Sequence, residues 1–431
     1  MTDRFGPSYL PKDEIEIRSQ SHKWLDMKLR TLLFWLHLSA GVAAGVVILI
    51  MSATGVLLTY ERQLIEWSDT GYRSIPRGPG AERLSIERLL ARAEEQRPEH
   101  RPSAITLRAD SDAPAALVLG PATLYQDVYS GDLLGEPSRD VRAVMSQLRA
   151  WHRWLALDGD QRALGKRLSG WGNVIFLFIV LSGMYLWIPR RWGWPNLRAV
   201  VFFRSGLRGK ARDFNWHNVI GIWCAIPLAI IVACAAPISF PWANALVYRI
   251  AGETVPPPAN AAATNRRQDQ SPIRYADELN ALWARAERQV PDWRSISLRL
   301  PTTADRTATF AIDSGTGGQP QRRSTLTLET RTGAVVRWEP FESQSPGRRL
   351  RSWTRFTHTG EYYGLIGQTL AGLVSSGAVV LVCTGLALAF RRFLRKSFTS
   401  GARVPARDAQ IPTESKPAAA SGAAARVWSE S

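Results

Sequence analysis

Four long apolar segments constrain what this chain can fold into more than any other feature of its sequence. Each reaches the length of about 20 mostly apolar residues that a helix needs to cross the hydrocarbon core of a bilayer. The predicted transmembrane helices are residues 32–60, 168–188, 217–242 and 358–390. We therefore expect an α-helical integral membrane protein that contacts membrane lipid through these four helices.

Lysines and arginines beside the spans predict the orientation of the chain. The stretch 189–216 carries seven basic residues against the single acidic residue Asp213, and the segment that follows the fourth span is also basic. Because basic loops stay on the cytoplasmic side, we expect these segments and both termini to be cytoplasmic. The two long connections then lie outside, which suits a multi-pass protein of a bacterial inner (cytoplasmic) membrane.

The positive charge of the chain does not indicate a nucleic-acid partner. The formal net charge is +17, yet the basic residues lie beside the spans or are mixed with acids, so they form no single stripe. The three cysteines, Cys224, Cys234 and Cys383, all fall within apolar segments, which argues against a disulfide framework. The sequence contains no Cys-x-x-Cys-His motif, so a haem in this protein would not be covalently attached.

The two halves of the chain follow the same plan. Each half runs from a span through a long external segment to a second span. In the external segments, residues 84–96 and 275–289 have helical apolar spacing, and strand-like alternation follows at 104–108 and 295–299. This order predicts an internal twofold repeat with a small α+β unit, a helix packed on an antiparallel sheet, in each half.

Short motifs beside the spans resemble those of the PepSY-associated transmembrane family. They are His37 with Gly41 in the first span, Trp151–Leu155 before the second, Trp216–Gly221 at the third and Phe356–Gly360 before the fourth. The resemblance extends from about residue 30 to 395. It implies four transmembrane helices and two periplasmic α+β PepSY-like domains, residues 61–167 and 243–357.

The remaining segments complete this organisation. They are a cytoplasmic N-terminal segment, 1–31, the basic cytoplasmic loop 189–216, and a basic cytoplasmic tail, 391–431, whose composition predicts disorder. One feature departs from the family pattern. Three spans contain a small polar residue followed by glycine, Thr54-Gly55, Ser182-Gly183 and Thr384-Gly385, whereas we expect Ala236-Pro237 to occupy this place in the third span.

Four of the six histidines lie at corresponding places in the two halves. His37 and His217 open the two outward-running spans, so we expect both near the cytoplasmic face. His152 and His358 precede the two inward-running spans, so we expect both near the periplasmic face. Singly, each is readily explained as an interfacial side chain, but one pair at each face is the arrangement that two bis-histidine haems require.

We therefore predict two b-type haems, with iron held by His37 and His217 at the inner site and by His152 and His358 at the outer site. Zinc fits less well, because a closed zinc site takes four ligands and neither face offers further cysteines or acids. Haem needs two axial nitrogens and small residues that let the ring approach the helices, for which the candidates are Gly41, Ala44, Gly45 and Gly221. Close helix packing is the alternative role of such glycines.

Arginines flank both outer histidines. Arg149 and Arg153 lie on either side of His152, and Arg351 and Arg355 lead to His358. We regard them as candidate contacts for haem propionates or for an anionic substrate. A solvated basic face is the alternative reading.

The resemblance implies a function in iron uptake, because proteins of this plan include reductases of periplasmic ferric siderophores. The expected activity is electron transfer to such a ferric chelate. The chain has no Gly-x-Gly-x-x-Gly motif after a predicted strand, so the electron donor would be quinol or a separate cytoplasmic flavoprotein. The alternative is a non-enzymatic protein whose membrane helices anchor PepSY-like binding or inhibitory domains. No catalytic residues are assigned.

Overall fold

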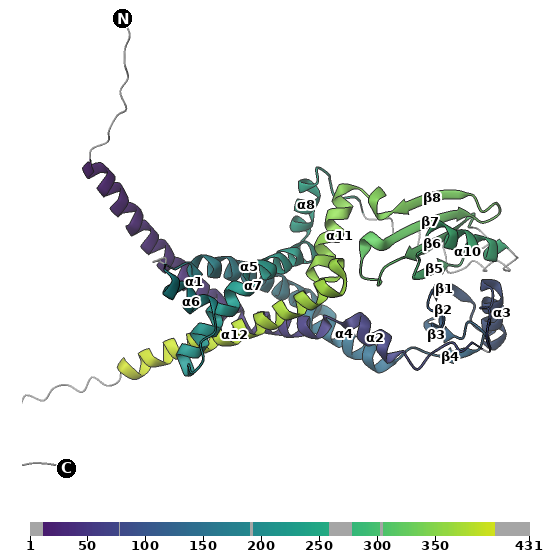
Figure 1. The fold of residues 1–431 in the computed structure, drawn as a ribbon, viewed down its shortest axis with the longest axis horizontal. Helices are drawn as coiled ribbons and strands as arrows, with labels where there is room; N and C mark the ends of the chain where they lie inside the picture. The colour runs from purple at the N-terminus through teal and green to yellow at the C-terminus, as the bar shows by residue number, and fades with distance from the viewer. Residues whose placement is uncertain (1–11, 77, 190–192, 258–277, 302–304, 401–431) are drawn as a thin grey trace, which may run out of the picture. The chain divides into compact units, whose positions relative to one another are not determined.

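The computed structural model describes residues 12–76, 78–189, 193–257, 278–301 and 305–400 (Figure 1). In this part of the chain, four helices are long and apolar enough to cross a membrane, over Met27–Leu58, Gly159–Trp187, Gly209–Ser239 and Glu361–Phe393. They belong to α1 (Lys12–Leu58), α5 (Arg162–Trp187), α7 (Gly209–Ser239) and α12 (Gly364–Ser400). The chain is a multi-pass membrane protein. The predicted disorder of the tail concerns residues 401–431, which lie outside the described residues.

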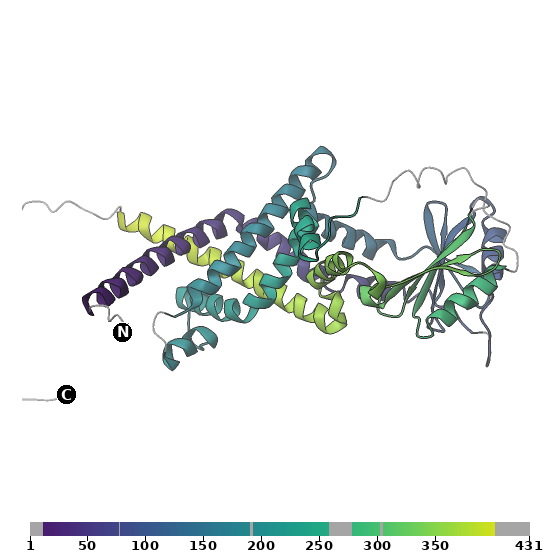
Figure 2. The ribbon, with the colours of Figure 1, turned by 90° about the horizontal axis from the view of Figure 1, so that it is seen from above.

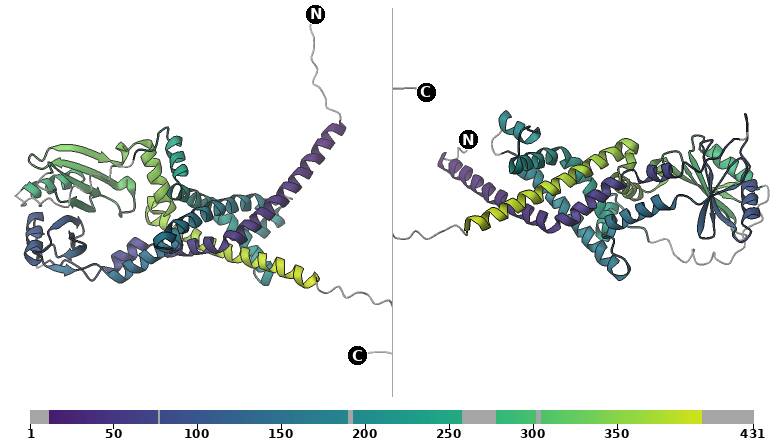
Figure 3. Two further views of the ribbon diagram at one scale, coloured as in Figure 1. Left: turned by 180° about the vertical axis from the view of Figure 1, so that it is seen from behind. Right: turned by 90° about the horizontal axis from the view of Figure 1, so that it is seen from below.

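The four spans pack on one another (Figure 3), but most of their apolar surface lies outside the protein. At most 33% of the residues in the most apolar window of each span are buried. In α7, for example, the side chains of Trp223 and Ile226 are 66% and 64% exposed. Such a surface is stable only in contact with lipid.

The third span ends earlier than its apolar pattern predicts. Helix α7 stops at Ser239, Phe240 is extended, and the separate helix α8 (Pro241–Ile250) begins with a proline. The ring of Pro241 disfavours helical geometry at the preceding residue, and proline is well suited to the first turn of the next helix. The predicted span of 217–242 therefore contains a helix break close to its end.

The extramembrane strands form one antiparallel sheet in the order β4-β3-β2-β1-β5-β6-β7-β8. The first half of the chain supplies β1 (Pro102–Arg108), β2 (Ala115–Leu119), β3 (Ala122–Gln126) and β4 (Leu133–Gly135). The second half supplies β5 (Ser295–Arg299), β6 (Thr307–Asp313), β7 (Arg323–Glu329) and β8 (Val335–Pro340). The halves meet where β1 pairs with β5, from Ala104 opposite Arg299 to Arg108 opposite Ser295. The sequence did not predict that the two α+β units would share a sheet.

A single hydrophobic core also spans both halves. The strands alternate, so that Ile105 of β1, Ile296 of β5 and Phe310 of β6 are buried on the same face. Helices α3 (Ile86–Gln96) and α10 (Glu278–Gln289) cover this face with their own apolar side chains (Figure 2).

Polar contacts join the halves at two further places. On α3 and α10, the carboxylate of Glu87 accepts hydrogen bonds from the backbone N–H and the side-chain amide of Asn280, at 3.1 and 2.6 Å. On the other face of the sheet, the hydroxyls of Thr106 and Ser297 lie 2.8 Å apart across the β1–β5 junction. The two halves are therefore connected through backbone, core and side chains alike.

Short helices connect the sheet to the spans. They are α2 (Glu61–Ser68), α4 (Arg139–Trp154), α8 and α11 (Pro346–His358), while α6 (Trp194–Val201) lies in the loop between the second and third spans. The last turns of α4 and α11 carry His152 and His358. A sharp turn follows each of these two helices, and a glycine allows the chain to pass close to its own backbone there. A Cβ on Gly165 would lie 2.1 Å from the carbonyl oxygen of Trp154 after α4. A Cβ on Gly367 would lie 2.2 Å from the carbonyl oxygen of Gly360 after α11.

Candidate functional site

The four span-associated histidines come together in two pairs. The ring centroids of His152 and His358 are 6.1 Å apart, with an angle of 45° between the ring planes. His37 of α1 and His217 of α7 lie near enough to interact electrostatically. Each pair takes one histidine from each half of the chain. The sequence predicts the same two pairs. Within each pair, the two histidines come from different helices.

The inner pair, His37 and His217, is held by hydroxyl groups on the neighbouring spans. The Nδ1 atom of His37 lies 2.9 Å from Oγ of Ser182 in α5. The Nδ1 atom of His217 lies 3.0 Å from Oγ1 of Thr384 in α12. Both histidines are therefore oriented by the second span of their own half.

The outer pair, His152 and His358, is held by the first span of each half. The Nδ1 atom of His152 lies 3.1 Å from Oγ1 of Thr54 in α1. The Nδ1 atom of His358 lies 3.0 Å from the backbone carbonyl oxygen of Ile231 in α7. Because a carbonyl oxygen can only accept, the proton of the His358 ring must be on Nδ1.

The hydroxyl partners of the other three rings are compatible with the same tautomer. Thr54, Thr384 and Ser182 donate their hydroxyl hydrogens to carbonyl oxygens of their own helices, at 2.6, 2.7 and 3.2 Å. Each hydroxyl oxygen is then free to accept the N–H of the histidine. All four Nδ1 atoms thus act as donors, and no Nε2 atom has a hydrogen-bond partner among the described residues.

A glycine lies beside each of the three hydroxyl contacts. A Cβ built on Gly55 would lie 3.5 Å from Cε1 of His152, and one on Gly183 or Gly385 would lie 3.3 Å from Cε1 of His37 or His217. No side chain therefore separates these helices from the imidazole edges. A Cβ would be tight against the rings of His37 and His217, whereas at Gly55 it would make an ordinary van der Waals contact with His152.

The two outer histidines are neutral at pH 7. Burial, followed by the positive charge that His358 would carry, lowers the pKa of His152 to about 4. Burial also lowers the pKa of His358. A neutral imidazole with its proton on Nδ1 presents a free electron pair on Nε2, which is the form that binds a metal ion.

The two pairs lie at opposite ends of the spans. In α1, His37 belongs to the inner pair and Thr54 contacts the outer pair, and these residues are about 25 Å apart at ~1.5 Å per helical residue. This distance is most of the thickness of the hydrocarbon core. The outer pair is at the end of the bundle from which α4 and α11 lead to the sheet.

The four candidate arginines have different surroundings. Arg149 forms an ion pair with Glu61 of α2, and Nε of Arg351 donates to Oδ1 of Asn244 in α8 at 2.6 Å. These two side chains therefore fasten α4 and α11 to their neighbours. The guanidinium groups of Arg153 and Arg355 lie 5.2 and 5.7 Å from the ring centroids of the adjacent residues Trp154 and Phe356.

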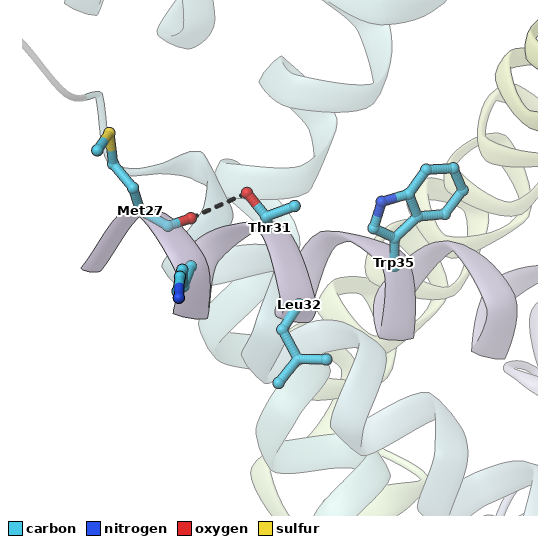
Figure 4. A pocket seen from close by; sticks show the side chains of 5 residues that line it. Met27, Thr31, Leu32 and Trp35 are labelled. Atoms are coloured by element: carbon cyan, nitrogen blue, oxygen red, sulfur yellow. Dashed lines mark hydrogen bonds between the residues drawn. The ribbon is translucent and has the colours of Figure 1, made fainter. Parts of the chain in front are cut away.

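The donor set favours a group that needs two ligands. Within the part of the chain that the structure describes, no three His, Cys, Asp or Glu side chains converge as metal ligands. A hollow elsewhere on the surface, shown in Figure 4, is lined by Met27, Lys28, Thr31, Leu32 and Trp35. All five residues come from α1, and none belongs to the histidine pairs, so this hollow is not part of the site.

The contact geometry corrects one expectation from the sequence. Each histidine that contacts a hydroxyl residue also faces the backbone carbonyl of the residue three positions before that hydroxyl residue. The pairs of carbonyl and hydroxyl residue are Ile179 and Ser182 for His37, Leu381 and Thr384 for His217, and Met51 and Thr54 for His152. For His358 this carbonyl belongs to Ile231. The position equivalent to the hydroxyl is therefore Cys234, followed by Ala235, whereas the sequence alone had suggested Ala236-Pro237.

Comparison with known proteins identifies the region that contains these histidines. The sequence pattern that defines the family described as the PepSY-associated TM region matches residues 34–392. The match includes all four histidines and nearly the whole length of the four spans. No protein with curated annotation matches the chain.

Proposed function

Because the chain belongs to the PepSY-associated TM region family, we propose that its paired histidines hold two b-type haems and that it carries electrons across the membrane. The proposal rests on the geometry of the outer pair: the ring centroids of His152 and His358 are 6.1 Å apart, and each Nδ1 atom has a partner on a neighbouring span, which leaves Nε2 as the atom available to a metal. We further propose that the acceptor is a ferric siderophore in the periplasm of a bacterium.

The spacing of the outer rings would let both imidazoles hold one metal ion. A metal–imidazole bond is about 2 Å long and the ring centroid lies about 1 Å farther away, so two rings on opposite sides of a metal have centroids about 6 Å apart. The centroids of His152 and His358 are 6.1 Å apart. The Nδ1–H bonds to Thr54 and Ile231 are the outer-shell contacts that metal-binding histidines usually make.

Haem would supply a one-electron redox centre at each side of the membrane. The protein contributes the positions: His37 and His217 hold the inner site, and His152 and His358 hold the outer site. The surrounding spans exclude water and lower the local dielectric, which tunes the reduction potential of a buried centre. The chain needs no catalytic acid or base for this role.

The proposed direction of electron flow follows from the basic loop at one end of the spans and the large sheet at the other. The basic residues of the 189–216 loop are near the inner pair and orient that end toward the cytoplasm, with both termini. The sheet is then periplasmic, with two PepSY-like halves related by an internal repeat. Quinol or a cytoplasmic flavoprotein would reduce the inner site, and the ferric chelate would oxidise the outer site.

Arg153 and Arg355 are the proposed contacts for haem propionates or for the anionic chelate. Each lies within three residues of an outer histidine, and the contacts described for its guanidinium group are with aromatic rings. Arg149 and Arg351 act indirectly in this proposal, because their partners Glu61 and Asn244 hold the histidine-bearing helices in place.

Re-oxidation kinetics test this proposal. The purified full-length protein is reduced chemically, mixed with a ferric siderophore, and followed at the absorption bands of b-type haem. We expect rapid re-oxidation that persists in His37→Ala and is lost in His358→Ala. A colourless protein would favour the non-enzymatic membrane anchor, and a haem protein indifferent to every ferric chelate would refute the proposed acceptor.

A further inference from the structure

Three of the four paired histidines contact the same two-residue step on a neighbouring span, a hydroxyl residue followed by glycine. We infer that Thr54-Gly55, Ser182-Gly183 and Thr384-Gly385 are positioning elements that aim the Nε2 atoms of the histidines, and that the third span achieves the same with a backbone carbonyl. This inference rests on the proposed function, since it assigns these residues a role in holding the haem ligands.

The hydroxyl fixes the tautomer and the rotation of the ring. In the membrane no water is present to satisfy a free N–H group, so the Nδ1–H donor needs a partner in the protein. Thr54 is such a partner: its oxygen lies 3.1 Å from Nδ1 of His152, while its hydrogen is donated to the carbonyl of Ile50 at 2.6 Å. Because the Thr54 hydrogen is donated to the helix backbone, its oxygen is available to accept the Nδ1–H of His152, and this arrangement favours the tautomer with a free Nε2.

The glycine fixes the position of the same ring. Cε1 lies between the two nitrogens of an imidazole, and Cε1 is the atom nearest to the position that a Cβ on Gly55, Gly183 or Gly385 would occupy, at 3.3–3.5 Å. The hydrogen bond holds one side of the ring while the backbone limits the adjacent atom. Consecutive residues therefore determine where Nε2 points, which neither residue would do alone.

The third span lacks both features of the step. Cys234 replaces the hydroxyl residue, and Ala235, which is buried, carries a Cβ where the other spans have none. At this place the His358 ring is bound by the carbonyl of Ile231, at 3.0 Å. Because a backbone acceptor cannot be removed by substitution, His358 should be insensitive to the side chain at position 234.

The expected consequence of losing a hydroxyl is a weaker and differently tuned haem. Removal of an outer-shell partner of a metal-binding histidine usually weakens metal binding 10- to 100-fold. Without the hydroxyl, the Nδ1–H group is left with only the helix carbonyl that the ring also faces, so Nε2 becomes a poorer electron donor and the reduction potential should rise. Each effect should be confined to one haem, the outer for Thr54 and the inner for Ser182 and Thr384.

The test compares Thr54→Val and Thr384→Val with a matched hydroxyl deletion, Ser376→Ala. Ser376 also donates to its own helix, to the carbonyl of Gly372 at 2.9 Å, but no hydrogen bond links it to a histidine. The readouts are the rate of haem transfer to excess apomyoglobin and the two midpoint potentials of the full-length protein. We expect a 10- to 100-fold faster loss of one haem in each valine variant, wild-type behaviour in Ser376→Ala, and rescue by Thr54→Ser.

Two results would overturn the inference while leaving the proposed function intact. The first is a wild-type protein with two haems whose Thr54→Val and Thr384→Val variants behave like Ser376→Ala. The second concerns the third span: if Cys234→Ala releases the outer haem as readily as Thr54→Val, the carbonyl of Ile231 does not position His358. A wild-type protein that binds no haem would instead refute the proposed function itself.

Discussion

Asp69 stabilises the connection between the sheet and the helix that carries His152, and its neutralisation is expected to weaken that connection measurably. Its carboxylate accepts two hydrogen bonds from the guanidinium of Arg142, at 2.9 and 2.5 Å, one from the N–H of Ser138 and one from the hydroxyl of Tyr125, both at 2.9 Å. These partners come from the start of α4 and from β3. The Asp69 side chain is only 9% exposed.

The expected loss in Asp69→Asn is about 2 kcal/mol. A hydrogen bond to a charged group contributes about 1.5–3 kcal/mol, and the side chain of Arg142 is 35% exposed, so water recovers part of what the guanidinium loses. For a cooperative unit of 150–250 residues, this loss lowers the melting temperature by roughly 4–8 °C. Asparagine keeps the shape of the side chain, so no cavity contributes to the effect.

The loss should also depend on pH. Burial by itself raises the pKa of Asp69, but the hydrogen bonds from Arg142, Ser138 and Tyr125 outweigh it, and the pKa lies below its ordinary value. A lowered pKa means that the stabilisation is fully present above the pKa of the unfolded chain, about 4, and is lost as the pH falls through the lower folded value. The wild type and Asp69→Asn should therefore differ at pH 7 and converge in acid.

Thermal unfolding of the two proteins in lipid nanodiscs at pH 7 and in acid measures this effect. Glu136→Gln is a suitable control, because Glu136 pairs with Arg139 on the surface near the same helix, where the side chains are 39% and 79% exposed. An exposed pair contributes at most about 1 kcal/mol. Equal melting of Asp69→Asn and Glu136→Gln at pH 7, or a deficit that persists unchanged in acid, would refute the reasoning.

Three further predictions concern the sheet, the turn after α4 and the outer arginines. Phe310→Ala should destabilise the sheet by about 3–5 kcal/mol, and limited proteolysis should then cleave both halves together; cleavage of the second half alone would indicate two independent cores. Gly165→Ala should release the outer haem and keep the inner one, as judged by haem content, and loss of both haems or of neither would argue against this role of the turn. Arg355→Gln should slow re-oxidation by an anionic ferric chelate at low salt, and the difference should disappear as salt screens the charge; a difference independent of salt would argue against this role.

The membrane helices and the histidine pairs could be predicted because they depend on local or symmetric features of the sequence. Twenty consecutive apolar residues define a span without reference to the rest of the chain. The topology then assigns His37 and His217 to one end and His152 and His358 to the other. The structure brings together the same pairs.

The shared sheet could not be predicted, because nothing near β1 identifies its partner. Residues 104–108 pair with residues 295–299, which are about 190 positions away and lie in the other half of the chain. An edge strand of an isolated four-stranded unit would have the same alternation. The sequence therefore predicts the strands of each half but not the pairing that unites them.

The partners of the histidines were missed for a different reason. A serine or threonine followed by glycine in a span is usually explained by close helix packing, so the pattern alone does not indicate a contact with a histidine ring. The third span is also ambiguous, because its sequence does not show whether Cys234-Ala235 or Ala236-Pro237 corresponds to the hydroxyl and glycine of the other spans. Only the carbonyl of Ile231 against His358 identifies Cys234-Ala235 as the equivalent step.

Haem quantification in the wild type and in the four single histidine-to-alanine variants tests the central claim most directly. We expect two haems per wild-type chain. The variants at His37 and His217 should lose the same haem, and the variants at His152 and His358 should lose the other, as resolved by a redox titration followed by absorbance. A wild-type protein without haem, or four variants that all lose the same haem, would contradict the assignment of two separate haem sites.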